Sequence, residues 1–285
     1  MPFSSVLIFT LSTLLSVVLA SEARSAPHDK SRYSLFNPTP TDQMRELSSD
    51  RPDSTEGAIT IDAGHFQLES DLYNRTFRAS KNGDREATTQ IFSSNIRTGL
   101  TDNLEFDLIV APYFKDETRT SGVTDDIQGS GDTTLRLKLN LLGNNGAALS
   151  IGLIPFVKMP TAAEGLGNKK VEGGLILPVG YDFPNDWELG AMLEVDASKN
   201  EDSDGFHMEW ITSITCAHPI IGDFSGYVEI YSGSSSEAHS TWKATFDTGL
   251  TYGLDPNVQL DIGTKLGLTR AADDMSPFLG FTARL

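Results

Sequence analysis

The stretch "TLRLKLNLL" at residues 134–142 alternates polar and apolar residues from Thr134 to Leu141. Such alternation is typical of a β-strand with two unlike faces, because successive side chains point to opposite sides of a sheet. The stretch alone leaves open which face meets water. Its two rows are the leucines Leu135, Leu137, Leu139 and Leu141, and the polar residues Arg136, Lys138 and Asn140.

Similar segments recur from residue 64 to the last residue, with turn residues between them. Each is about ten residues long, which is the length that a tilted strand needs to cross a bilayer. No helical period of comparable length competes with them. The sequence therefore predicts an all-β chain of twelve antiparallel strands, at residues 64–74, 89–100, 104–114, 132–142, 147–158, 171–182, 187–197, 207–217, 223–231, 241–252, 257–268 and 276–285.

The connections between the predicted strands are of two kinds. After even-numbered strands they are short, as in "TDN" (101–103) and "GNNG" (143–146). After most odd-numbered strands they are long and polar, as in residues 75–86, 115–131 and 198–206. Short turns at one end and long loops at the other are typical of an up-and-down outer-membrane β-barrel. An even strand number also places both ends of the barrel at the short-turn side.

One row of the predicted strands contains no Asp, Glu, Lys or Arg. A charge on a lipid-facing row costs about 2–4 kcal/mol for Arg or Lys at the bilayer midplane, so a membrane barrel is expected to keep this row free of charge. A soluble β-sandwich also alternates, because its outer faces meet water, and it remains an alternative.

The opposite row carries the charges and is expected to line the lumen of a barrel too wide for side chains to fill. Acids outnumber bases two to one on this row, which predicts a net negative lumen with a preference for cations. The alternative is that these charges pair with each other and plug the lumen. The acids are Glu69, Asp71, Glu105, Asp107, Glu172, Glu188, Glu194, Asp196, Glu209, Glu229, Asp247 and Asp261, and the bases are Arg97, Arg136, Lys138, Lys158, Lys243 and Lys265.

Aromatic residues on the apolar row gather near both strand ends, as expected for the girdles at two membrane interfaces. Pro112, Pro155 and Pro178 fall inside predicted strands, where a proline removes a ladder hydrogen bond, so bulges or strand ends are expected there. The aromatic residues are Tyr181, Trp187, Phe224 and Tyr252 beside short turns, and Phe114, Trp210 and Trp242 beside long loops.

The chain before the strands divides into two parts. Residues 1–20 are apolar and end in "VLA", which predicts an exported signal peptide; an uncleaved anchor is the alternative. Residues 21–60 are polar and rich in proline, and are expected to form a periplasmic extension or a plug. Residues 61–285 are the predicted outer-membrane barrel.

Composition excludes several classes of protein. The formal net charge is −17 and no dense run of Lys and Arg occurs, so a nucleic-acid partner is not expected. Cys216 is the single cysteine, which excludes a disulfide framework and cysteine metal pairs. No cofactor and no metal ion are predicted.

Seven stretches in a fixed order resemble the bacterial outer-membrane proteins grouped as the "meta-pathway of phenol degradation" transporter family. They cover most of the chain beyond residue 48 and include "SSDRPDSTEG" (48–57), "GHFQLESDL" (64–72), "GLTDNLEFDLIVAPY" (99–113) and the ending "PFLGFTARL" (277–285). The resemblance implies a Gram-negative outer-membrane barrel that passes small molecules, including aromatic or hydrophobic compounds. It also implies contact with membrane lipid, lipopolysaccharide and the barrel assembly machinery.

The resemblance carries over no substrate-binding residue. Asp50, Arg51, Asp53 and Glu56 of "DRPDSTEG" are candidates to tie the N-terminal segment to the lumen or to the periplasmic rim.

Two further functions remain open beside the non-enzymatic channel. A lipid-acting enzyme would need a serine, a histidine and an acid, for which His207, Glu209 and Ser213 are candidates on one strand. A structural or adhesive barrel would use the acidic stretches 124–132 and 200–205 to bridge lipopolysaccharide through divalent ions. Neither stretch has the spacing of an EF-hand loop, so solvated loop charge is the favoured interpretation.

Overall fold

The structure is a computed structural model that describes residues 29–79, 83–201 and 203–285. The predicted signal peptide lies outside the described residues. Within them the chain is almost entirely β, with one short 3-10 helix, η1 (Thr41–Gln43). None of the helices in the described ranges is long and apolar enough to cross a membrane.

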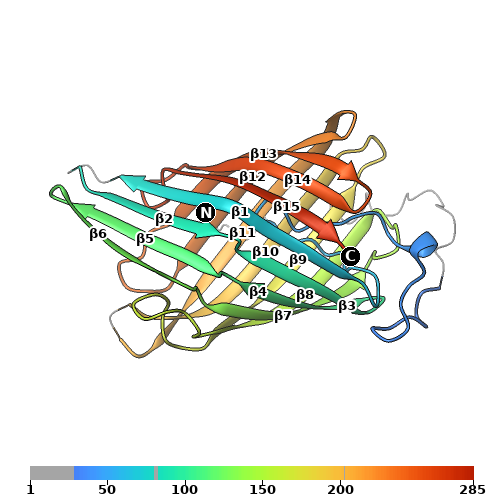
Figure 1. The fold of residues 1–285 in the computed structure, drawn as a ribbon, viewed down its shortest axis with the longest axis horizontal. Coiled ribbons are helices and arrows are strands. Elements are labelled where there is room, and N and C mark those ends of the chain that lie inside the picture. Colours follow the sequence, from blue (N-terminus) through green and yellow to red (C-terminus); the bar gives the residue numbers. More distant parts are fainter. Residues whose placement is uncertain (1–28, 80–82, 202) are drawn as a thin grey trace, which may run out of the picture.

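The strand segments of the described residues form one antiparallel sheet, in which some segments pair out of chain order, as β4 does with β7 and β2 with β5 (Figure 1). They are β1 (Phe66–Ala79), β2 (Arg85–Ile91), β3 (Ser94–Thr101), β4 (Leu104–Val110), β5 (Tyr113–Thr120), β6 (Val123–Gly129), β7 (Thr133–Leu142), β8 (Leu149–Met159), β9 (Glu172–Asp182), β10 (Glu188–Lys199), β11 (Phe206–Ile221), β12 (Phe224–Ser235), β13 (Lys243–Asp255), β14 (Val258–Gly267) and β15 (Met275–Arg284).

Pairing of the first and last strands closes the sheet into a barrel. β1 pairs with β15 on one side and with β2 and β3 on the other. β2 and β3 are two parts of one long strand, and so are β4 with β5 and β6 with β7, because each part pairs with the matching part of the next strand. Counted in this way the barrel has twelve strands, and the prediction of a closed twelve-stranded transmembrane barrel is confirmed.

Prolines do not all act as expected. Pro112 lies in the break between β4 and β5, so the predicted strand end is confirmed there. Pro155 and Pro178 lie inside β8 and β9, where the prediction of a bulge or strand end is wrong. The β8–β9 register stays constant around them, from the pair Ile151 and Val179 to the pair Ile154 and Ile176. The missing proline N–H groups interrupt the ladder there without shifting it.

Two of the predicted long loops are also mostly strand. The sequence predicts residues 75–86 and 115–131 as polar connections between strands, but β1, β2, β5 and β6 continue through most of them. Their side chains are mostly polar on both faces, so the apolar and polar alternation that marks a strand stops although the backbone pairing does not. A two-residue turn at Ser121 and Gly122, both with positive φ, joins β5 to β6 in a tight hairpin.

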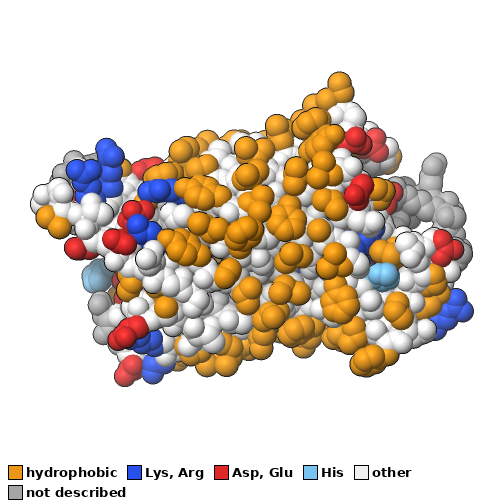
Figure 2. Space-filling view, viewed as in Figure 1, with side chains coloured by type: hydrophobic (Ala, Val, Ile, Leu, Met, Phe, Trp, Pro, Cys, Tyr) orange, Lys and Arg blue, Asp and Glu red, His pale blue; other side chains and the backbone are white. Residues whose placement is uncertain are grey.

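The two faces of the strands differ as a membrane barrel requires. Leu135, Leu137 and Leu141 are 38, 44 and 54% exposed on the outside, whereas Lys138 and Asn140 between them are buried. On the face shown in Figure 2, apolar side chains cover the middle of the barrel, and charged groups gather toward its two ends. The leucine row of "TLRLKLNLL" therefore faces lipid, and its polar row faces inward.

Aromatic residues border this band at both ends. At the short-turn end Trp187 stacks on His218 with ring centroids 4.5 Å apart, and Phe224 stacks on Tyr252 at the same distance. Trp242, next to the long-loop end, donates a hydrogen bond from its Nε1 to Ser232. These positions suit amphipathic rings at a membrane interface.

A charge placed on the outer row tests this orientation. We expect Leu137→Lys to lower the free energy of unfolding by about 2–4 kcal/mol, because the ammonium group would lie in hydrocarbon. Urea titration of the protein folded in lipid vesicles, followed by the gel mobility of unheated samples, measures the change. Leu137→Phe is the matched control and should behave like the parent protein. An unchanged urea midpoint for Leu137→Lys would mean that this row faces water.

Candidate functional site

The chain before β1 enters the barrel as a loop. Residues 45–62, called here the lumenal loop, pass from the short-turn end into the interior and return to the same end (Figure 1). The two ends of the loop are joined, because the Arg45 backbone N–H donates to Asp62 Oδ2 at 2.7 Å. Lys30 Nζ lies 2.9 Å from Asp62 Oδ1 and reinforces this junction.

A cluster of buried charges holds the middle of the loop against the wall. Arg97 of β3 lies 2.6 Å from Glu69 of β1 and 2.6 Å from Glu105 of β4, measured from guanidinium nitrogen to carboxylate oxygen. Asp50 of the loop completes the cluster, with one oxygen 3.3 Å from Arg97 and in contact with the ammonium of Lys138 on β7. One loop carboxylate thus contacts two wall bases that come from different strands.

The pKa values of two carboxyl groups of the loop are shifted in opposite directions. Burial alone would raise the pKa of Asp50, but the charges of Arg97 and Lys138 outweigh burial and hold the pKa at about 2. Burial and the nearby carboxylate of Glu229 raise the pKa of Asp53 well above its ordinary value. Asp50 is therefore the ionised anchor, and Asp53 the carboxyl that retains a proton most readily.

Arg51 connects the loop to the seam where the barrel closes. Its guanidinium contacts Asp71 of β1 at 2.7 Å and binds both oxygens of Asp261 on β14, at 2.7 and 3.0 Å. Between these strands lies β15, where Gly280 leaves room for the guanidinium: a Cβ there would stand 2.0 Å from Arg51 Nη2. Arg51 therefore bridges the first strand to the strands that close on it.

The tip of the loop binds β7 and three strands further round the wall. Ser54 donates from its backbone N–H to Glu229 at 2.9 Å, and its hydroxyl accepts from the ammonium of Lys265. The hydroxyls of Thr55 and Ser213 lie 2.6 Å apart. Glu56 forms an ion pair with Arg136. Each of these contacts joins a loop residue to a different strand among β7, β11, β12 and β14.

The returning part of the loop is held through its backbone. The Ala58 carbonyl accepts from Asn140 at 2.8 Å, and the Ile61 N–H donates to Glu105 at 2.6 Å. The chain runs so close to β3 that a Cβ on Gly99 would lie 2.1 Å from the Asp62 carbonyl oxygen. Glycine is thus required at position 99 for this approach of two backbones.

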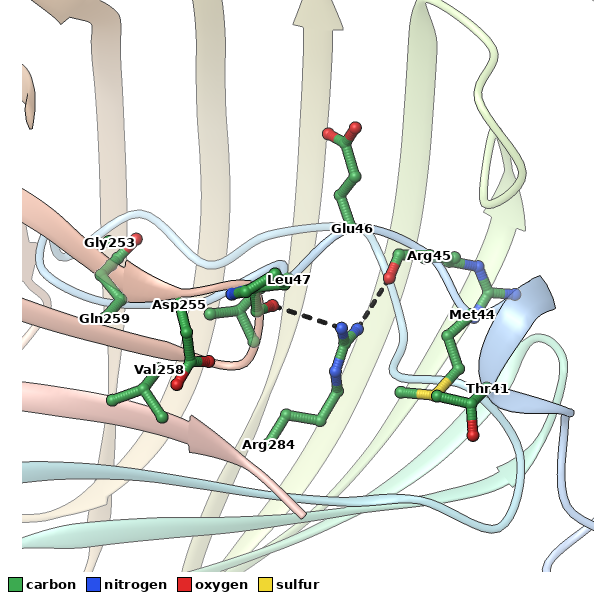
Figure 3. Close-up of a pocket in the computed structure, with 11 residues that line it drawn as sticks. Thr41, Met44, Arg45, Glu46, Leu47, Gly253, Asp255, Val258, Gln259 and Arg284 are labelled. Atoms are coloured by element: carbon green, nitrogen blue, oxygen red, sulfur yellow. Dashed lines mark hydrogen bonds between the residues drawn. The ribbon is translucent and has the colours of Figure 1, made fainter. Parts of the chain in front are cut away.

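A cavity of about 400 Å³ opens at the short-turn end, where the loop enters (Figure 3). Residues 41–47 form one side, and the β13–β14 turn with the end of β15 forms the other. Arg284 of β15 crosses this cavity and donates to the Arg45 carbonyl at 2.7 Å and to Asn257 at 2.8 Å. This rim cavity therefore lies between the start of the lumenal loop and the wall.

A second cavity of about 500 Å³ occupies the interior at the long-loop end. Asp53, Ser54 and Glu56 form its floor, and side chains from nine strands and the β14–β15 connection form its walls. It shares no lining residue with the rim cavity. Between the two lie the charge cluster of Arg97 and the loop, where Arg97, Glu105 and Lys138 have no exposed surface.

The residues expected to line the lumen all lie on the inward row, but their surroundings differ. Two are exposed at the strand ends, Glu188 and Lys243. Glu172 pairs with Lys158 rather than with the loop. Partly buried are Asp71, Arg136, Lys158, Glu194, Asp196, Glu209 and Lys265, and buried are Glu69, Arg97, Glu105, Asp107, Lys138, Glu172, Glu229, Asp247 and Asp261.

Sequence reasoning missed an apolar patch on the inner wall. Ile154, Ile176 and Met192 are buried there, with Phe156, Ile211 and Tyr231 packed against them. The signal for this patch was present: around Pro155 and Pro178 both rows are apolar, so the alternation fails. The inward row is therefore not polar throughout.

The residues considered for catalysis do not form a relay. His207 Nε2 lies 3.0 Å from Glu209, and its Nδ1 lies 3.0 Å from Asn200, so both ring nitrogens face acceptors. Ser213 is hydrogen-bonded to Thr55. It lies six residues after His207 on β11, which is about 20 Å along the strand at about 3.3 Å per residue. This distance precludes the serine–histidine hydrogen bond that acyl transfer needs.

The acidic stretch 124–132 forms most of β6 and not a calcium loop. Residue 202 of the other stretch lies outside the described part of the chain. Among the described residues, no group of three or more His, Cys, Asp or Glu is placed to hold a metal ion.

Closed, antiparallel, with an apolar belt and a charged interior, the chain is a β-barrel of the outer-membrane type. Residues 49–285 match the family described as putative MetA-pathway of phenol degradation, and the chain belongs to this family. A comparison with curated protein sequences finds no match.

Solved structures with the same fold are outer-membrane barrels. An outer membrane channel from Pseudomonas putida F1 aligns with a TM-score of 0.61 at 12% identity, covering 84% of this chain and all of that one. The NanC porin gives a TM-score of 0.50 at 11% identity, covering 75% of this chain and 100% of that chain. The β domain of the Bordetella autotransporter BrkA gives 0.51 at 8% identity, covering 78% and 99%. At these identities the likeness concerns the fold alone.

Loss of the Arg51 bridge should weaken the closed barrel. We expect Arg51→Leu to lower the free energy of unfolding by about 3–5 kcal/mol, because Asp71 and the buried Asp261 would lose their shared counter-charge. The urea midpoint for loss of the fast-migrating gel band measures the change. The urea midpoint of Arg51→Lys should lie between those of the parent protein and Arg51→Leu, since an ammonium group cannot bind both oxygens of Asp261 in a fork. Arg78→Leu, at an exposed position of β1, is the matched control; equal midpoints for Arg51→Leu and Arg78→Leu would refute the bridge.

Proposed function

We propose that the protein is an outer-membrane channel for small molecules, with the short turns in the periplasm and the long loops outside the cell. In this conformation the lumenal loop closes the channel, and passage requires the loop to move. The observation that carries the proposal is that the lumen has two separate cavities, one at each end, with the lumenal loop between them.

The contacts between the lumenal loop and the wall are of a kind that allows the loop to leave the channel. Most are hydrogen bonds and ion pairs between hydrophilic partners, as between Asp50 and Lys138 or between Ser54 and Glu229, although Ala58 and Ile61 of the loop are buried as well. When the whole loop withdraws, water enters the lumen and solvates both partners of each pair, so the cost is smaller than that of removing one partner from a buried pair. Both ends of the loop lie at the periplasmic side, so the loop can withdraw toward that side as a unit.

The wall charge supports selectivity for cations. The inward row has twice as many acids as bases, and the loop residues 45–62 add more acids than bases. A lumen with this excess of carboxylates concentrates cations and repels anions. The inner apolar patch supports solutes that carry an apolar part, in agreement with the aromatic or hydrophobic compounds suggested by the family name.

A disulfide between loop and wall tests the gating role. Thr55 and Ser213 have hydroxyls 2.6 Å apart, and two cysteines there need an S–S distance of about 2 Å. We expect Thr55→Cys/Ser213→Cys, made together with Cys216→Ala to remove the native thiol, to lose conductance when oxidised and to regain it with dithiothreitol. Planar-bilayer recording measures the conductance.

Thr55→Cys with Cys216→Ala is the matched control, because it has one thiol and no bond to form. Equal conductance of the oxidised and reduced double-cysteine protein, with the disulfide verified by mass spectrometry, would show that the loop does not gate. No conductance from any of these proteins would exclude the channel itself.

Ion selectivity provides an independent test. We expect the reversal potential in a KCl gradient to show preference for K⁺ over Cl⁻, and Glu194→Gln/Asp196→Asn to lower the permeability ratio, because two inward carboxylates are removed. Asp84→Asn, in the connection before β2, is the matched control and should leave the ratio unchanged. A preference for Cl⁻ in the parent protein would contradict the acidic lumen.

A further inference from the structure

One row of inward residues at the long-loop end runs from an acid to a base. Each residue of the row is the direct partner of the next across neighbouring strands, and such partners point to the same face of an antiparallel sheet. Three of the four line the long-loop-end cavity, so the row faces the lumen. The row consists of Glu194 of β10, Ile211 of β11, Gly233 of β12 and Lys243 of β13.

The middle of this row leaves free space against the wall. A Cβ added to Gly233 would meet no atom within 4 Å. Beside this glycine Ile211 packs against the buried apolar cluster of Ile154, Ile176 and Met192. The row therefore has a carboxylate at one end, an ammonium group at the other, and an apolar stretch with open space between them.

The acidic end of the row lacks a counter-charge. Glu194 and Asp196 are two residues apart on β10 and share its inward face. Within the described residues neither carboxylate lies at ion-pair distance from a base, and Asp196 Oδ1 has no hydrogen-bond partner. Arg136 of β7 and Lys158 of β8 pair with other carboxylates instead. Two neighbouring carboxylates repel each other, so a cation beside them is favourable.

The basic end of the row is free as well. Lys243 is exposed at the start of β13, and no carboxylate in the described part of the chain lies at ion-pair distance from it, including Asp273, which lines the same cavity. Lys265, the other lysine of the cavity, lies closer to the floor and donates to the Ser54 hydroxyl. Glu194 is partly exposed, so a ligand can reach both ends of the row.

The distance between the two ends sets the length of a ligand. Neighbouring strands lie about 4.8 Å apart, so Glu194 and Lys243, three strands apart, are separated by about 14 Å along the curved wall. The two side chains cover part of this distance as they extend into the lumen. A compound with the length of a short alkyl chain covers the rest.

We propose that this row binds a flexible zwitterion, with an ammonium group at one end of a short alkyl chain and a carboxylate at the other. The ammonium group contacts Glu194, the chain lies over Ile211 and Gly233, and the carboxylate contacts Lys243. This inference rests on the proposed function, because it names a class of solute that the channel would receive at its long-loop end.

Compounds with a single charge fit the row less well. A carboxylate alone would contact Lys243 but would leave Glu194 and Asp196 without a cation. An alkylamine would contact Glu194, but it would add positive charge to a cavity that Lys243 and Lys265 already line. A zwitterion places opposite charges at both ends and adds no net charge to the lumen.

Equilibrium binding tests the site without requiring passage. The full chain in lipid nanodiscs is titrated calorimetrically at neutral pH and low salt with 6-aminohexanoate, hexanoate and hexylamine. Empty nanodiscs are titrated in parallel to subtract partitioning into lipid. We expect saturable binding of 6-aminohexanoate that is about tenfold or more tighter than that of either singly charged compound, the ratio expected from one hydrogen bond to a charged group.

Substitutions identify the two ends of the site. Glu194→Gln should lower the affinity for 6-aminohexanoate to about that for hexanoate, and Lys243→Met should lower it to about that for hexylamine. Gly233→Leu should abolish the saturable heat without changing the charge, because its side chain fills the open space. Glu164→Gln, at an exposed position of the β8–β9 connection, is the matched control and should bind as the parent protein does. The gel mobility shift of unheated samples verifies that each variant is folded.

Each outcome separates this inference from the channel. Equal affinity for the three probes, no saturable binding of 6-aminohexanoate, or parent-like affinity in both charge variants would overturn the site. Saturable binding of 6-aminohexanoate by a protein that never conducts would leave the site standing and remove the channel. Conductance without any saturable binding would do the reverse.

Discussion

Charge neutralisation inside the narrow lumen is the constraint on which the rest of the interior depends. Arg97 and Lys138 have no exposed surface, and Glu69 and Glu105 lie beside them. In such surroundings an uncompensated charge is strongly unfavourable, because water cannot solvate it. Glu69 and Glu105 compensate Arg97, and the Asp50 carboxylate gives Lys138 an ion-pair partner while it also contacts Arg97. Hence the N-terminal segment is part of the interior electrostatics of the barrel rather than an appendage.

The outside of the barrel obeys a different requirement. Lipid offers no hydrogen bonds, so every backbone group of the wall must pair with another strand, and pairing of β1 with β15 removes the free edges that an open sheet would leave. The outer side chains have only to be apolar, as Leu137 is. The inner side chains have no such uniform rule, and this freedom allows ion pairs, glycines and an apolar patch on one face.

The sequence predicted the wall well because the wall repeats. Alternation with a period of two, seen first in residues 134–142, recurs in each strand and is a local property of the chain. The prediction failed where the alternation ceases: in the hairpins through residues 75–86 and 115–131, whose side chains are mostly polar on both faces, and around Pro178, where both rows are apolar. Strand pairing continues at these places because it depends on the backbone.

The interior site was beyond local reasoning. Asp50 and Lys138 are 88 residues apart in the chain, and Arg51 and Asp261 are 210 apart, so no spacing in the sequence connects them. The charged stretch "DRPDSTEG" indicated candidates for contact with the barrel but not their partners. Which carboxylate meets which base follows from the curvature of the closed wall, and only the assembled barrel specifies it.

The junction of Arg45 with Asp62 has a topological consequence. Because the chain enters and leaves the lumen at the same rim, residues 45–62 form an unthreaded loop, and within the described residues no segment inside the lumen runs from one mouth of the barrel to the other. A threaded segment would have to be in place before the first and last strands meet. An unthreaded loop can enter the lumen after the wall has closed, and can leave it again without opening the ring of strands.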